Sequence, residues 1–188
     1  MIRNTESIAD KILIPYLVGL SLLFCASSIA GFFTPSAIRR EILELLVSSL
    51  AGIESATGGM LFLYILLRNL AVTFLTLLCG LLFGIAPLIV VALNGFVLGV
   101  AYAQVGGAIG YWKAAGAVVP HGVLEIPALI VAAGYGLWLG AKVLQRIRGR
   151  ESSSIVPQLK HALKGFIRIV VPLLIAAAGI ETVLILAQ

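Results

Sequence analysis

The length, composition and charge of this chain together indicate an integral membrane protein. Of its 188 residues, 61% are hydrophobic and only 11% are charged, and the mean hydropathy is +1.12. Soluble domains are closer to half apolar and a quarter charged, so a soluble globular domain is excluded. The net charge of +5 does not indicate nucleic-acid binding, because the Lys and Arg residues lie beside apolar runs, where they set membrane topology.

The N-terminal part of the chain is expected to hold one span and one amphipathic segment. A first span is predicted over residues 12–33, and its length favours a retained helix over a signal peptide cleaved near residues 26–30. Residues 36–54 carry charges at helical amphipathic spacing, which predicts an interfacial or re-entrant helix. The alternative is a sixth span over residues 42–59, which would place every later segment on the opposite side of the membrane.

Four further spans and one basic loop are predicted in the rest of the chain. These spans cover about residues 60–83, 87–103, 115–140 and 166–187. Residues 142–164, which hold six of the 13 Lys and Arg residues, are interpreted as a basic polar loop. The predicted fold class is therefore an all-α, polytopic transmembrane helix bundle with about five spans plus one interfacial or re-entrant amphipathic helix, forming a single domain over residues 1–188.

The distribution of basic residues predicts the orientation in the membrane. Nine Lys and Arg residues fall on one side of the predicted bundle and three on the other. The nine are Arg3, Lys11, Arg168 and the six of residues 142–164, and the three are Arg39, Arg40 and Lys113. Basic residues favour the cytoplasmic side, so we expect a cell-membrane protein with its N-terminus in the cytoplasm and its C-terminus outside. The basic loop can also contact anionic lipid, at about 1 kcal/mol per basic residue.

Small residues within the spans indicate how the helices pack. Four glycine pairs have G-x-x-x-G spacing, which allows close approach of two helices within the bundle or across a dimer: Gly80/Gly84, Gly95/Gly99, Gly106/Gly110 and Gly136/Gly140. Because they lie in apolar spans, these glycines do not predict a phosphate-binding loop. Cys25 and Cys79 also lie in apolar runs without His or acidic neighbours, and we expect both to be packing residues.

Polar side chains inside the predicted spans form the candidate site. His121 and Glu125 are four residues apart, about one helical turn, which places both on one face of the fourth span. Pro127 removes a helix hydrogen bond close to that face, so we expect a broken helix there. The topology predicts that the polar residues of several spans converge in the outer half of the bundle: Arg68, Asn69, Asn94, His121, Glu125 and Glu181.

Three interpretations of this cluster are open from the sequence. Arg68 paired with one glutamate and His121 with the other would give a neutral network that specifies packing. The same groups could bind an ion, a lipid headgroup or a segment of a partner protein. His121, Glu125 and Glu181 could instead hold a divalent metal as a cofactor, although no H-E-x-x-H motif accompanies them. No catalytic residue is predicted.

The order of these residues resembles the stage II sporulation protein M family. The matching features are Asn69, Asn94-Gly95 with Gly99, Pro120-His121-Gly122 with Glu125 and Pro127, Gly136, Gly140 and Ile180-Glu181, within about residues 60–188. The resemblance implies a multi-span membrane fold and a scaffold role. The protein after which the family is named resembles a membrane anchor that recruits peptidoglycan-processing proteins to a septum.

The expected function is therefore a multi-pass membrane scaffold that recruits partners. The expected partners are membrane lipids, other membrane or envelope proteins and a second copy in a homodimer, without nucleic acid. The alternative function is a small transporter or an ion- or lipid-binding membrane protein that uses the polar cluster. An intramembrane metal-dependent hydrolase is the third interpretation, and enzymatic activity is not the expected one.

Overall fold

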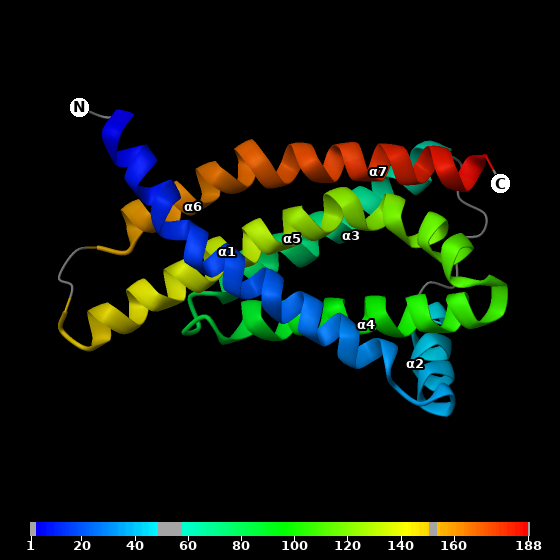
Figure 1. The fold of residues 1–188 in the computed structure, drawn as a ribbon. Coiled ribbons are helices and arrows are strands. Elements are labelled where there is room, and N and C mark those ends of the chain that lie inside the picture. The colour runs from blue at the N-terminus through cyan, green and yellow to red at the C-terminus, as the bar shows by residue number, and fades with distance from the viewer. Residues whose placement is uncertain (1–2, 49–57, 151–153, 188) are drawn as a thin grey trace.

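The chain folds into a bundle of long helices (Figure 1). The computed structural model describes residues 3–48, 58–150 and 154–187, without the side chains of residues 3–12, 46–48 and 117–121. Within these ranges every regular element is helical, which confirms the all-α prediction. The elements are α1 (Arg3–Phe32), α2 (Ser36–Ser48), α3 (Gly58–Cys79), α4 (Ile85–Ile109), α5 (Tyr111–Ile147), α6 (Val156–Gly165), the π-helical turn η1 (Phe166–Val170) and α7 (Val171–Leu186).

Five helical stretches are long and apolar enough to cross a membrane, as the sequence predicts. They are Leu13–Phe32, Gly58–Cys79, Ile85–Ile109, Gly122–Ile147 and Val156–Leu186. Helix α2 has 13 residues, too few to cross a hydrocarbon layer of about 30 Å. It lies at the end of the bundle where α1 ends and α3 begins (Figure 1). Its described residues therefore do not form the alternative sixth span, and the rest of that segment, residues 49–57, lies outside the described residues.

Two sequence-based expectations about the fourth span and the segment after it are wrong. Helix α5 is continuous from Tyr111 to Ile147 despite Pro120 and Pro127, so the span is not broken. It accommodates the prolines by arching, as Figure 1 shows, because bending relieves the clash of a proline ring with the preceding turn. The predicted loop over residues 142–164 is also largely helical, since α5 runs to Ile147 and α6 begins at Val156.

A π-helical turn joins α6 to α7, so the last span is one continuous helix. Pro172 has no N–H to donate to the carbonyl of Arg168, and its ring would crowd that carbonyl in a regular α-helical turn. The preceding turn is widened instead, with the N–H of Val171 donating to the carbonyl of Phe166. The wider turn lets the helix continue through the proline.

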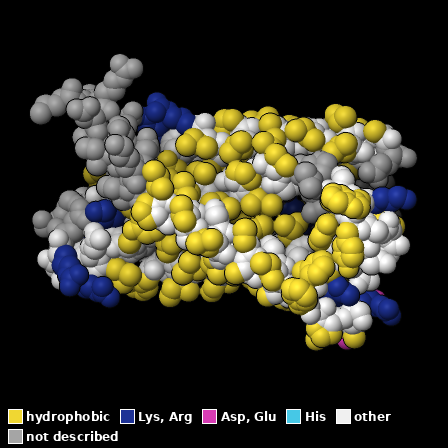
Figure 2. Space-filling view, in the orientation of Figure 1, with side chains coloured by type: hydrophobic (Ala, Val, Ile, Leu, Met, Phe, Trp, Pro, Cys, Tyr) yellow, Lys and Arg dark blue, Asp and Glu magenta, His cyan; other side chains and the backbone are white. Residues whose placement is uncertain are grey.

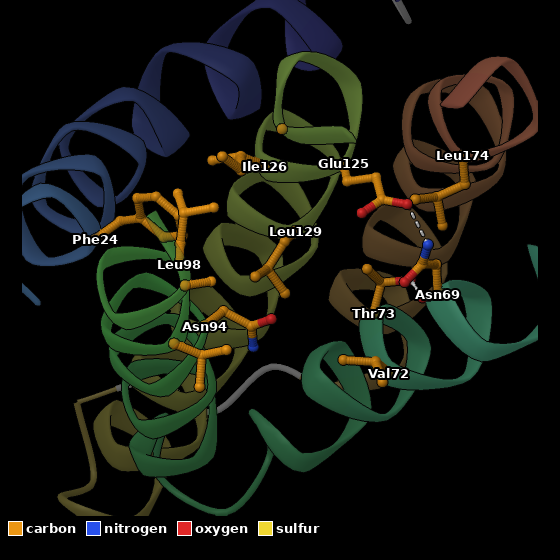
Figure 3. A pocket seen from close by; sticks show the side chains of 13 residues that line it. Phe24, Asn69, Val72, Thr73, Asn94, Leu98, Glu125, Ile126, Leu129 and Leu174 are labelled. Atoms are coloured by element: carbon orange, nitrogen blue, oxygen red, sulfur yellow. Dashed lines mark hydrogen bonds between the residues drawn. The ribbon is translucent and has the colours of Figure 1, made fainter. Parts of the chain in front are cut away.

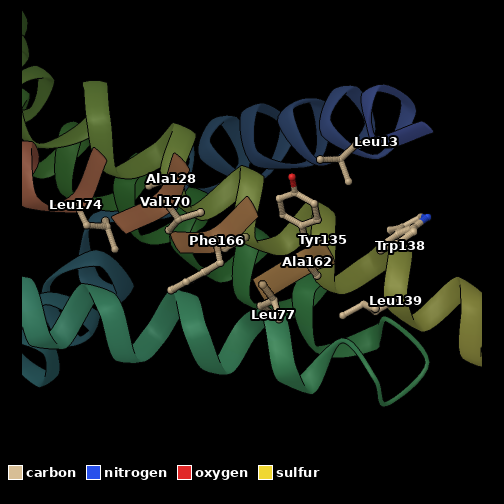
Figure 4. Packing of buried hydrophobic residues seen from close by; sticks show 11 residues of the cluster. Leu13, Leu77, Ala128, Tyr135, Trp138, Leu139, Ala162, Phe166, Val170 and Leu174 are labelled. Atoms are coloured by element: carbon tan, nitrogen blue, oxygen red, sulfur yellow. The ribbon is translucent and has the colours of Figure 1, made fainter. Parts of the chain in front are cut away.

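Helix α5 is the centre of the bundle. It packs against α1, α3, α4 and α7, and half of its span (50%) is buried, compared with 17–28% of the other spans. Buried side chains of α1, α3, α5, α6, η1 and α7, including Leu77, Tyr135, Trp138, Phe166 and Val170, form the larger apolar cluster (Figure 4). The outer spans expose apolar side chains around the middle of the molecule, and most Lys and Arg residues gather toward its two ends (Figure 2). This pattern suits a lipid environment.

Three of the four G-x-x-x-G pairs are used inside the bundle. Gly80 and Gly84 pack against Gly136 and Gly140, and a Cβ added at Gly80 or Gly140 would overlap backbone atoms of the opposite pair. The Gly95/Gly99 pair lies against the backbone of α1 in the same way. These contacts provide the close helix approach for which the spacing is typical. The three pairs therefore do not require a second copy of the chain.

The termini lie at opposite ends of the bundle (Figure 1). The start of α1, the end of α5 and the start of α6 share one end, and α2 and the end of α7 share the other. The basic residues of α5 and α6 therefore lie at the same end as the N-terminus, as the four spans that precede this segment require. That this end faces the cytoplasm stays a prediction.

Candidate functional site

A pocket of about 240 Å³ lies between α3 and α4, with α5 as its floor (Figure 3). The two helices diverge from the turn at residues 80–84 that joins them (Figure 1), and the pocket occupies the space between them. Its volume exceeds that of one water molecule several times over. It is lined by Phe24 of α1, Asn69, Val72 and Thr73 of α3, Asn94, Val97, Leu98 and Ala101 of α4, Gly122, Glu125, Ile126 and Leu129 of α5, and Leu174 of α7.

A hydrogen bond between α3 and α5 holds the polar side of this pocket together. The side-chain amide Nδ2 of Asn69 donates to Oε1 of Glu125 (Figure 3). The backbone carbonyl of Asn69 accepts a 2.7 Å hydrogen bond from the hydroxyl of Thr73. Both Asn69 and Glu125 are partly buried among apolar side chains, where an unsatisfied carboxyl or amide would be costly. The pair therefore fixes how α3 sits on α5 and presents a carboxyl group to the pocket.

Asn94 stands on the opposite wall, on α4. Its side-chain Nδ2 donates a 2.8 Å hydrogen bond to the carbonyl of Val90, one turn earlier in the same helix. The residue is exposed, and Figure 3 shows its carboxamide directed into the gap between α4 and α3. The pocket therefore has an amide on one rim and an amide-bound carboxyl on the other side, with apolar walls between them.

Two of the other predicted site residues, Arg68 and Glu181, do not line this pocket. Arg68 is exposed on α3, does not line the pocket, and forms no ion pair with any described residue. Glu181 is half-buried on α7, seven residues beyond Leu174, which places it about 10 Å further along that helix. His121 lies in α5 one turn before Glu125, but its side chain is outside the described ones. The metal set of His121, Glu125 and Glu181 therefore stays a prediction.

Several lining residues carry no signal in the sequence. Val72, Leu129 and Leu174 are ordinary apolar residues of apolar helices, and only the packing identifies them as pocket walls. Thr73 could have been found, because it lies one helical turn after Asn69 and therefore on the same face. Among the described side chains, the polar groups of the pocket are those of Asn69, Thr73, Asn94 and Glu125, which can donate and accept hydrogen bonds and supply one ionisable group.

Comparison with known families identifies the family to which the chain belongs. The family model described as Stage II sporulation protein M matches residues 20–184, a range that contains every residue lining the pocket. Comparison with curated proteins and with solved structures gave no match. The matched range covers nearly the whole chain and all five spans, in part or in full. The chain therefore belongs to the stage II sporulation protein M family.

Proposed function

We propose that this protein is a membrane scaffold that recruits a partner by docking one transmembrane helix of that partner between α3 and α4, with side chains of that helix filling the pocket. The observation that carries the proposal is a pocket with polar groups set between two lipid-facing helices. In a membrane, helices associate through close packing and interhelical hydrogen bonds, and a polar group left in lipid is costly. The exposed amide of Asn94 is suited to a partner helix in the gap.

The closed end of the pocket supports binding over passage of a solute. The turn between α3 and α4 is packed against α5 through Gly80, Gly84, Gly136 and Gly140. A path for an ion or a small molecule would need an opening at this end as well as at the wider one. Resemblance to an anchor of envelope enzymes points to the same role. In this proposal the basic end with α6 faces the cytoplasm and the C-terminus lies outside.

Site-directed photocrosslinking in native membranes tests the proposal. A photoreactive benzoylphenylalanine at Val72 or at Val97 would stand on opposite walls of the pocket. We expect both positions to give an adduct with the same partner protein, because a helix between α3 and α4 touches both. The adduct is measured by immunoblot mass shift and identified by mass spectrometry. The substitution Ala101→Trp, which fills the pocket, should abolish the protein adduct at both Val72 and Val97.

Exposed positions on other faces provide the matched controls. Leu22 on α1 and Ile175 on α7 are also exposed and apolar but do not line the pocket. The probe at these positions should react with lipid only. Equal protein adducts at all four positions, or lipid adducts alone at Val72 and Val97, would contradict a pocket that holds a partner helix. A lipid adduct confined to Val72 and Val97 would favour the lipid-binding alternative.

Metal content separates the scaffold from the metal-dependent alternative. A scaffold whose Glu125 serves packing and partner binding needs no metal, so we expect elemental analysis of the purified protein to give substoichiometric metal. The His121→Ala variant should give the same value, since the loss of one ligand matters only where a metal is bound. Near-stoichiometric zinc in the wild type that disappears in the variant would instead support the site of His121, Glu125 and Glu181.

A further inference from the structure

Arg68 is a charged side chain on the outside of a membrane-crossing helix. It stands at the midpoint of α3 (Gly58–Cys79), is exposed, and forms no ion pair with any residue that the structure describes. Charged residues at this depth of a span are rare, and they usually pair with another polar group or face a water-filled space. The bundle itself gives Arg68 no such counter-charge among its described residues. We therefore expect the guanidinium of Arg68 to interact with a group outside the bundle.

The position of Arg68 relates it to the pocket. It lies four residues, or about one helical turn, before Val72, which lines the pocket from α3. Residues with this spacing lie on one face of a helix, so Arg68 continues the pocket-side edge of α3 toward the wider end. Long helical side chains lean toward the N-terminus of their helix, which also directs the guanidinium toward that end. A helix resting in the pocket would pass this group.

We propose that the partner helix carries an aspartate or a glutamate within its span and that this carboxylate pairs with Arg68. The inference rests on the proposed function, because it names the chemistry of the helix that the pocket holds. A guanidinium binds a carboxylate through two parallel hydrogen bonds, and the low dielectric of the membrane strengthens the attraction. The exposed amide of Asn94 on the other wall adds a hydrogen-bonding group at the same pocket.

The acidic residues of this chain argue for a different protein as partner. The described acidic side chains are Glu41, Glu44, Glu125 and Glu181. Glu41 and Glu44 lie on the short helix α2, Glu125 is bonded to Asn69 inside the pocket, and Glu181 lies near the end of α7. None of the described carboxylates is therefore exposed at the midpoint of a span, where a second copy would need one to reach Arg68.

Charge substitution at Arg68, read out by the Val72 photocrosslink, tests this inference. We expect Arg68→Leu to reduce the protein adduct about tenfold or more, because a desolvated carboxylate of the partner loses its counter-charge. Arg68→Lys should retain most of the adduct, since it keeps the positive charge. Arg40→Leu, which removes an exposed cation on α2, is the matched control and should leave the yield unchanged. The amount and thermal stability of each variant in the membrane are measured alongside.

The identified partner supplies the second half of the test. The crosslinked span should contain an Asp or Glu, and replacing that residue by Arg should restore the adduct of the Arg68→Glu variant. An adduct that Arg68→Leu leaves unchanged, or a crosslinked span without an acidic residue, overturns this inference but leaves the scaffold in place. The absence of any protein adduct in the wild type overturns both. An adduct of the mass of two copies of this chain overturns the inference of a different partner.

Discussion

Replacing Gly99 by alanine is expected to lower the free energy of unfolding by about 1–3 kcal/mol or more. The added Cβ would overlap the backbone carbonyl of Ser28 and approach the backbone N of Phe32, so α1 and α4 must move apart. Backbone atoms of two packed helices cannot rotate away as a flexible side chain would. Equilibrium unfolding of the purified protein in mixed detergent micelles, followed by circular dichroism or tryptophan fluorescence, measures the change.

Gly107 on the same helix is the matched control for this prediction. A Cβ added at Gly107 meets no atom within 4 Å, and the residue lies within α4. Gly107→Ala should therefore be neutral or stabilising, because alanine is the better helix former by about 1 kcal/mol. Equal losses from Gly99→Ala and Gly107→Ala would show that the contact of α1 with α4 does not depend on the close approach at Gly99.

The number of spans could be predicted from the sequence because each span is a long apolar run. The element ends could not, since α4 continues to Ile109 through Gly106 and Gly107, which disfavour helix, and α5 continues to Ile147 through residues that favour it. The segment after residue 142 is polar and basic, a pattern that predicts a loop. Lys, Arg, Gln and Leu are all good helix formers, and a helix can extend beyond the apolar part of a span. Polarity marks where the lipid ends and does not mark where the helix ends.

The partner of Glu125 shows where prediction of the site fails. Arg68 and Asn69 are adjacent in the sequence, and a charge-based argument pairs the arginine with a glutamate. Adjacent helical residues point about 100° apart, so only one of them can face α5. Because α3 is apolar on all sides, its sequence does not reveal which face is buried. The structure turns Asn69 toward Glu125 and leaves Arg68 exposed.

Removing both partners of the Asn69–Glu125 hydrogen bond should cost less than the two single losses added together. Asn69→Leu takes an amide donor from a partly buried carboxyl group, and we expect a loss of about 1–3 kcal/mol in the free energy of unfolding. Glu125→Leu leaves the Asn69 amide without this acceptor and should also destabilise the bundle. In the double variant neither polar group is left, so its loss should fall short of the sum by about 0.6–1.7 kcal/mol. The same detergent unfolding experiment measures all three variants.

Asn94→Leu provides the control for this cycle and links it to function. Asn94 lines the same pocket but bonds within its own helix, so its effect should add to that of Glu125→Leu without coupling. Additive losses for Asn69 and Glu125 would contradict a stabilising bond between α3 and α5. The double variant also separates packing from recognition, because it keeps α3 on α5 with apolar contacts alone. If it folds and still gives the Val72 adduct, the pair serves packing; if it folds and loses the adduct, the carboxyl group belongs to the partner site.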